Sequence, residues 1–88
     1  MNKRWVNVFK ALSNINRIKI IKTLSRGKSL SVTEMSEELG ISVKSTSKHL
    51  IMLQNLDLLE SNGKHAHVFY SLNKNLPPDF KKTISLFC

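Results

Sequence analysis

A run of serine, lysine and histidine side chains near the middle of the chain has the residue types that bind nucleic acid. The run consists of Ser42, Lys44, Ser45, Ser47, Lys48 and His49. A lysine ammonium group can donate hydrogen bonds to guanine O6 and N7 or to phosphate, and a serine hydroxyl can donate or accept. The run therefore predicts contact with DNA without specifying a base sequence. The alternative is a solvated helix face, on which serine and lysine are equally common, with His49 as a packed side chain.

A second polar and basic group begins thirteen positions after His49. It consists of Asn62, Gly63, Lys64, His65 and His67. Asn-Gly favours a tight turn, so we expect a hairpin of two short strands, Leu58 to Ser61 and His67 to Leu72, joined around Asn62-Gly63. The tip of such a hairpin can approach the minor groove or the DNA backbone, where Lys64 would neutralise phosphate. An ordinary exposed hairpin is the alternative. His65 and His67 could share one side of a strand, but two imidazoles without a third ligand make a weak zinc site, so no metal is expected.

The segment that carries the first run has the pattern of a helix-turn-helix. Ser31 and Glu34 form an S-x-x-E capping box that opens a short helix, and Gly40 ends it. Ser42 can cap a longer helix that runs to about Leu56. In a helix-turn-helix the second helix enters the major groove and its N-terminal residues reach the base edges.

Helices are also predicted before and after this segment. The first has Trp5, Val8, Phe9 and Leu12 at helical spacing, and the second follows Asn14 as its N-cap with Ile18, Ile21 and Leu24 inward. Pro77 and Pro78 start a last helix, on which Phe80, Ile84 and Phe87 share a face. The fold class is therefore mainly α with a small β-hairpin, a winged helix-turn-helix in the order α-α-α-α-β-β-α.

Length and charge agree with one nucleic-acid-binding domain. The 88 residues are enough for a single domain, residues 1–88. Fourteen Lys and Arg against six Asp and Glu give a net charge of +8, which attracts polyanions, although lysine-rich chains can also be basic for solubility alone. The sequence has no apolar run long enough for a membrane span and no pattern of a signal peptide, so a cytoplasmic protein is expected. The single cysteine, Cys88, excludes an internal disulfide framework.

From Phe9 to Leu72 the chain resembles the ArsR family of winged-helix repressors. The matching pieces are Ala11-Leu12, Asn14, Arg17, Ile20-Ile21, Leu39-Gly40-Ile41-Ser42, Ser47-Lys48-His49-Leu50 and Val68-Phe69-Tyr70-Ser71-Leu72. The resemblance implies a homodimer that binds double-stranded DNA at an inverted repeat and regulates transcription, most commonly as a repressor. It also implies that the first and last helices pair across the dimer, with the candidate interface residues Trp5, Phe9, Phe80, Ile84 and Phe87. Their alternative role is the core of the single chain.

The family's metal-ligand motifs are missing. The Cys-x-Cys pair that many members carry at the start of the third helix corresponds here to Ser31 and Thr33, and hydroxyls do not bind soft metals as thiolates do. The family's alternative metal site uses acidic and histidine ligands in the last helix, and here that helix contains Asp79 but no histidine. Neither a metal nor another cofactor is therefore expected.

Enzymes are the class of protein that the sequence disfavours most. It contains no Ser-His-Asp constellation, no paired acids suited to a pocket, no Gly-rich phosphate loop and no nucleophilic cysteine motif. The alternatives to a sequence-specific regulator are a winged-helix protein-interaction module and a nonspecific architectural DNA-binding protein.

Overall fold

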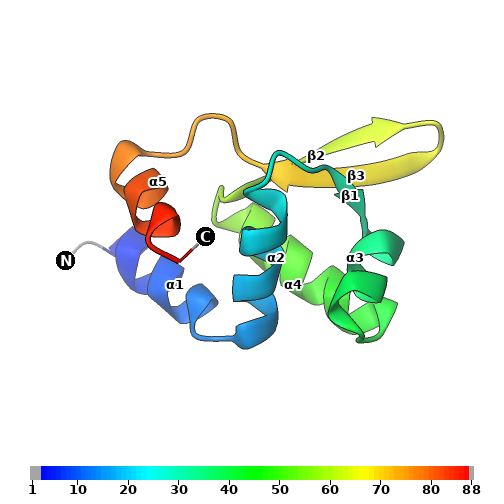
Figure 1. The fold of residues 1–88 in the computed structure, drawn as a ribbon, viewed down its shortest axis with the longest axis horizontal. Coiled ribbons are helices and arrows are strands. Elements are labelled where there is room, and N and C mark those ends of the chain that lie inside the picture. The colour runs from blue at the N-terminus through cyan, green and yellow to red at the C-terminus, as the bar shows by residue number, and fades with distance from the viewer. Residues whose placement is uncertain (1–2, 88) are drawn as a thin grey trace.

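The computed structural model describes residues 3–87 and has the predicted winged helix-turn-helix architecture (Figure 1). Its elements, in chain order, are α1 (Lys3–Leu12), α2 (Ile15–Leu24), β1 (Leu30–Ser31), α3 (Val32–Leu39), α4 (Val43–Asn55), β2 (Leu59–Lys64), β3 (His67–Leu72) and α5 (Pro78–Ser85). The two-residue strand β1 was not predicted, because it is too short to show a periodicity of its own. No helix within residues 3–87 has the length and apolar character to span a bilayer.

Polar side chains cap the helices where the sequence predicts helix starts. Asn14 Oδ1 accepts hydrogen bonds from the backbone N–H groups of Asn16 and Arg17, at 2.9 and 3.3 Å. At α3 the Ser31 hydroxyl accepts from the Glu34 N–H at 3.2 Å, and the Glu34 carboxylate accepts from the Ser31 N–H at 2.9 Å, which completes the capping box. Such caps contribute about 1 kcal/mol each, so these boundaries are fixed by local chemistry.

The apolar core lies between the helices, with α2 at its centre. Because α2 contacts α1, α3, α4 and β3, its buried face is wider than one stripe. Ile20, Ile21 and Leu24 are the buried residues of this helix, and Ile18 is only half-buried. The prediction of Ile18 as a core residue was therefore wrong, since the contacts of α2 on several sides place Ile20 inside instead.

The three strands form an antiparallel sheet in the order β1-β3-β2. In the hairpin, the paired residues run from Leu59 opposite Leu72 to Lys64 opposite His67. The two-residue turn is therefore His65-Ala66, with φ of 52° and 64°, as a tight hairpin turn of this length requires.

The predicted turn at Asn62-Gly63 was wrong, because both residues lie within β2 and pair with Phe69 and Val68. A turn there would place Leu59 opposite Ala66. The observed register instead places Leu59, which is 3% exposed, opposite the partly buried Leu72 beside the core. Burial of this leucine pair outweighs the local preference of Asn-Gly for a turn.

Candidate nucleic-acid interface

Helix α4 has one buried face and one polar face. Thr46, Leu50 and Leu53 are completely buried and fix the helix against the core, and α3 packs beside it. Of the residues predicted to contact DNA, the exposed ones are Ser42, Lys44, Ser45 and Lys48, whereas Ser47 and His49 are half-buried. The exposed four lie at the start of the helix, which is the part that reaches base edges in a helix-turn-helix.

The turn between α3 and α4 is held by backbone hydrogen bonds. Gly40 ends α3 in the left-handed conformation with φ of 69°, and the N–H groups of Gly40 and Ile41 both donate to the Ser36 carbonyl, at 2.9 and 3.3 Å. Ser42 then caps α4, and its hydroxyl accepts from the Ser45 N–H at 3.0 Å. The geometry of the polar face thus follows from Gly40 and Ser42.

Arg17, on α2, connects α4 to α1. Its Nε donates to the Ala11 carbonyl at 2.5 Å and its Nη2 to the Lys10 carbonyl at 3.4 Å, while Nη1 lies 3.3 Å from His49 Nδ1. Because the guanidinium only donates, His49 Nδ1 is the acceptor of this contact. Burial, and after it the charge of Arg17, lowers the pKa of His49 below its ordinary value of 6.5.

His49 is therefore half-buried and in contact with Arg17, as in the packed alternative that the sequence left open. Arg17 was not among the site residues predicted from the sequence. Its only signal was that Arg17 belongs to the segment that resembles the ArsR family.

The hairpin of β2 and β3 extends away from the helices (Figure 1). All of the residues predicted for the wing are exposed: Asn62, Gly63, Lys64, His65 and His67. Lys64 and His67 face each other as the last pair of the ladder, next to the turn. The expectation that His65 and His67 share one side of a strand was wrong. The hairpin turn lies at His65-Ala66, so His65 is in the turn and not on a strand.

Helices α1 and α5 lie side by side at the end of the molecule opposite the hairpin tip (Figure 1). The aromatic and apolar residues predicted for the dimer interface divide into two groups. Phe80 and Ile84 are 0% and 5% exposed, so they belong to the core of the single chain. Phe9 and Phe87 are 47% and 37% exposed, and the half-buried Trp5 ring lies between the groups, 5.5 Å from the Phe9 ring and 5.9 Å from the Phe80 ring. Cys88 lies outside the described residues.

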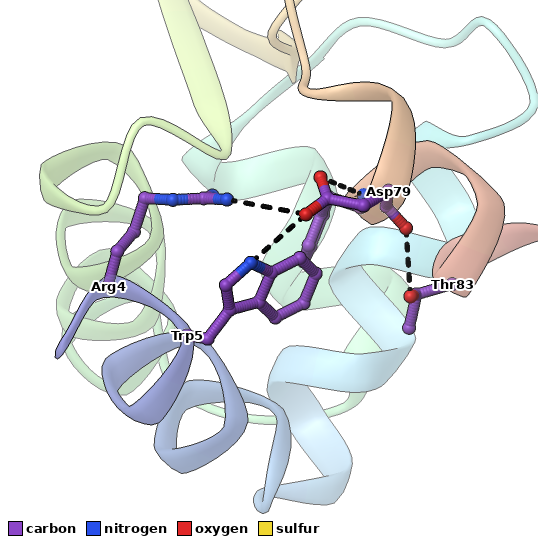
Figure 2. Close-up of polar contacts among 5 residues, drawn as sticks. Arg4, Trp5, Asp79 and Thr83 are labelled. Carbon is purple, nitrogen blue, oxygen red and sulfur yellow. Dashed lines mark hydrogen bonds and ion pairs between the residues drawn. The ribbon is translucent and has the colours of Figure 1, made fainter. Parts of the chain in front are cut away.

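Asp79 joins α5 to α1 through a set of polar contacts (Figure 2). Its Oδ2 accepts a hydrogen bond from Trp5 Nε1 at 3.1 Å and lies 3.8 Å from the Arg4 guanidinium, which is placed 5.0 Å over the Trp5 ring. Asp79 Oδ1 accepts from the Phe80 N–H at 2.8 Å, and its carbonyl accepts from the Thr83 hydroxyl at 2.9 Å. Asp79 thus holds the first turn of α5 against the start of α1.

Comparison with known proteins places these features in one family. Residues 14–61 match the family model described as "Bacterial regulatory protein, arsR family". The chain belongs to the ArsR family. It is 34% identical over 73 residues to the transcriptional repressor SdpR of Bacillus subtilis (strain 168), a match that covers 83% of this chain and 80% of SdpR. As an ArsR-family protein it is a DNA-binding transcription regulator and not an enzyme, which confirms the class predicted from the sequence.

Two solved structures of similar proteins have the same fold. HlyU from Vibrio cholerae N16961 superposes with a TM-score of 0.81 at 31% identity, covering 98% of this chain and 92% of HlyU. The homodimeric winged helix-turn-helix domain of Mb0332 from Mycobacterium bovis superposes with a TM-score of 0.79 at 22% identity, covering 94% of this chain and 73% of that domain.

The residues at the ArsR family's thiolate positions do not fit a soft metal ion. The Ser31 hydroxyl accepts the Glu34 N–H in the capping box, and Thr33 on the exposed side of α3 offers a second hydroxyl. Hydroxyls at these positions lack the charge and polarizability of thiolates. Within residues 3–87, no group of three or more His, Cys, Asp or Glu side chains is placed to hold a metal.

Proposed function

We propose that this ArsR-family protein is a cytoplasmic homodimeric repressor that binds an inverted-repeat operator through α4 and the wing. The observation that carries the proposal is the exposed serine and lysine face at the start of α4, together with the exposed wing that carries Lys64. That face is held in place by the buried Thr46, Leu50 and Leu53. The repressor assignment is supported by the similarity to SdpR, a transcriptional repressor.

Each part of the interface has its own task in this proposal. Lys44 and Lys48 are one helical turn apart, so both point from the same side of α4 into the major groove. The hydroxyls of Ser45 and Ser47 lie between them along the helix and add adaptable donors and acceptors. Lys64, at the end of the hairpin, neutralises backbone phosphate beside the groove. The net charge of +8 draws the protein to DNA before any specific contact forms.

The dimer is proposed to form through α1 and α5. These helices lie at the opposite end of the molecule from the hairpin tip, so pairing through them leaves α4 and the wing free (Figure 1). The exposed Phe9 and Phe87 supply apolar surface there. The homodimeric state of the Mb0332 domain, which has the same fold, supports self-association of this chain.

Selection of binding sites from a random duplex library at about physiological salt tests the proposal. Specific contacts must then outcompete nonspecific electrostatic binding. We expect enrichment of an inverted repeat with half-sites roughly 10 base pairs apart, centre to centre. Salt-sensitive binding without enrichment would instead identify a nonspecific architectural protein. Absence of DNA binding would identify a protein-interaction module.

A further inference from the structure

A cleft of about 670 Å³ lies away from the proposed DNA interface, between the end of α2, the end of β3 and the helix α5. Its apolar part is formed by the side chains of Leu24, Leu72, Leu76 and Ile84. Three of these belong to the core, with Leu24, Leu76 and Ile84 at most 7% exposed. The cleft therefore has a firm apolar floor that is continuous with the core.

Four exposed cationic side chains line the same cleft: Arg26, Lys28, Lys74 and Lys81. Among residues 3–87, no Asp or Glu side chain lines it. Within residues 3–87 the one ion pair is between Arg4 and Asp79, so none of the four cations is neutralised by a carboxylate. The result is an uncompensated positive field over an apolar floor.

The fold explains only part of this charge. Arg26 and Lys28 follow the C-terminus of α2, where the helix dipole favours cations. Lys74 lies in the β3–α5 connection and Lys81 in the middle of α5, and neither position has that advantage. Placing four like charges around one cleft costs free energy through mutual repulsion, which an anionic ligand would relieve.

Hydroxyl groups add hydrogen-bonding capacity to the cleft. Within the described part of the chain, the hydroxyls of Ser29 and Ser71 form no hydrogen bond in the structure, whereas the hydroxyls of Ser25 and Ser85 donate to backbone carbonyls of their own helical segments. Ser29 and Ser71 thus remain able to donate to a ligand oxygen.

We propose that this cleft binds a small amphipathic organic anion. Its phosphate or carboxylate head lies among the four cations and the two free hydroxyls, and its short apolar body covers the leucine and isoleucine floor. DNA is a poor occupant, because the DNA backbone has no apolar part to cover that floor. The cleft also adjoins the end of β3 that is about 20 Å from the wing turn, given the rise of a six-residue strand.

A second cleft is less suited to such a ligand. It has about 540 Å³, lies between α1 and α4, and contains the cations Lys10, Arg17 and Lys48. The Arg17 guanidinium there is already bonded to the carbonyls of Lys10 and Ala11 and to His49. Lys48 belongs to the proposed DNA interface. The first cleft is the one whose cations have no other assigned partner.

The proposal is tested by NMR titration of the full-length protein, without DNA, using hexyl phosphate as the probe. We expect saturable amide shifts centred on Ser29, Ser71 and Ile84. Inorganic phosphate and hexanol serve as controls that each carry one half of the probe, and both should bind at least about tenfold more weakly. If the amides of these cleft residues all shift with the same dissociation constant, the cleft is identified as the binding site.

Two matched double variants separate the cleft from general surface charge. Lys28→Ala with Lys81→Ala removes two cleft cations and should weaken binding of the probe at least about tenfold, the loss expected for two charge-assisted contacts. Lys22→Ala with Lys82→Ala removes the same charge from exposed lysines that do not line the cleft, and should leave the affinity within about twofold.

Several outcomes would overturn the proposal. They are shifts that do not saturate, shifts centred on the α1–α4 cleft or the wing, equal weakening by both double variants, and binding of hexanol or of inorganic phosphate as tightly as the probe. The inference goes beyond the proposed function and uses no duplex, so failure here leaves the operator experiment unaffected. A ligand in this cleft contacts α5 and β3 at once, which links the proposed dimer helix to the central strand of the sheet.

Discussion

Single residues of the interface are expected to act on DNA in different ways. In the proposed complex Lys48, on the exposed side of α4, contacts bases, and Lys64, beside the hairpin turn, contacts phosphate. We therefore expect Lys48→Ala to weaken the binding free energy for the selected operator by about 1–3 kcal/mol and to change the binding free energy for unrelated duplexes little. Lys64→Ala should weaken binding on every duplex and reduce the slope of log affinity against log salt by about 1. Fluorescence anisotropy over a salt series measures both effects.

Lys19→Ala is the matched control for these two variants, because it removes an exposed lysine of α2 that lines neither cleft and is not part of the proposed interface. Ser47→Ala should follow Lys48→Ala in its selectivity, with a smaller loss, since Ser47 is half-buried. Uniform losses on operator and random duplex for Lys48→Ala would contradict the assignment of α4 as the helix that distinguishes bases.

The Arg17–His49 contact predicts a pH dependence of folding. The pKa of His49 is lowered in the folded chain, so between that value and 6.5 the unfolded chain binds more protons. The free energy of unfolding therefore rises with pH across this window, and stability is lost as the pH falls below 6.5. His49→Gln should remove this part of the slope, as measured by urea unfolding at a series of pH values. If the unfolding free energy of His49→Gln depended on pH as in the wild type, His49 would not be the source of this pH dependence.

The two causes of the shift at His49 can be separated by NMR titration of its ring. In Arg17→Gln the pKa of His49 should rise, because the nearby positive charge is gone. It should remain below 6.5, because burial is the larger cause. The same variant loses the guanidinium bonds to Lys10 and Ala11, so it should also unfold at a lower urea concentration.

At the scale of helices and strands, the helix boundaries could be predicted and the hairpin register could not. Caps act over three or four residues, so Asn14, Ser31 and Ser42 are visible in the sequence and appear in the structure as predicted. The register of β2 and β3 depends on which leucine reaches the core, which is a contact between strands and not a property of the turn. Asn62-Gly63 was therefore a misleading local signal.

Gly40, at the end of α3, and Gly63, in β2, should respond differently to substitution. Gly40→Ala places a side chain in the left-handed conformation, at φ of 69°, and should lower the free energy of unfolding by about 1 kcal/mol or more. Gly63→Ala in β2 has no positive φ, and the added methyl group would meet no atom within 4 Å, so it should be neutral or slightly stabilising. Urea unfolding of both variants makes the comparison. A loss at Gly63 as large as the loss at Gly40 would contradict the observed position of the turn.

Across the whole molecule, the features that sequence reasoning missed are contacts between distant segments. Arg17 meets His49 across 32 positions and Trp5 meets Asp79 across 74, and no local pattern encodes either pair. The cationic cleft likewise takes its side chains from α2, β3, α5 and their connections. Residue types and helical spacing identified the polar face of α4 and the wing, because those depend on neighbours within one element. They did not separate the core aromatic Phe80 from the exposed Phe9.

That separation gives a sharp test of the proposed dimer. Phe80→Ala would remove a completely buried ring and cost about 3–5 kcal/mol of folding free energy, so its effect on assembly would be mixed with unfolding. Phe9→Ser changes a side chain that is 47% exposed on α1 and should give a folded monomer, whereas Val68→Ser, at 50% exposure on the wing, should leave the dimer intact. Sedimentation equilibrium with circular dichroism measures mass and folding together, and the wild-type mass should be twice the 10.0 kDa of one chain. A folded Phe9→Ser dimer would exclude this part of α1 from the interface, and a wild-type monomer at micromolar concentration would exclude the dimer itself.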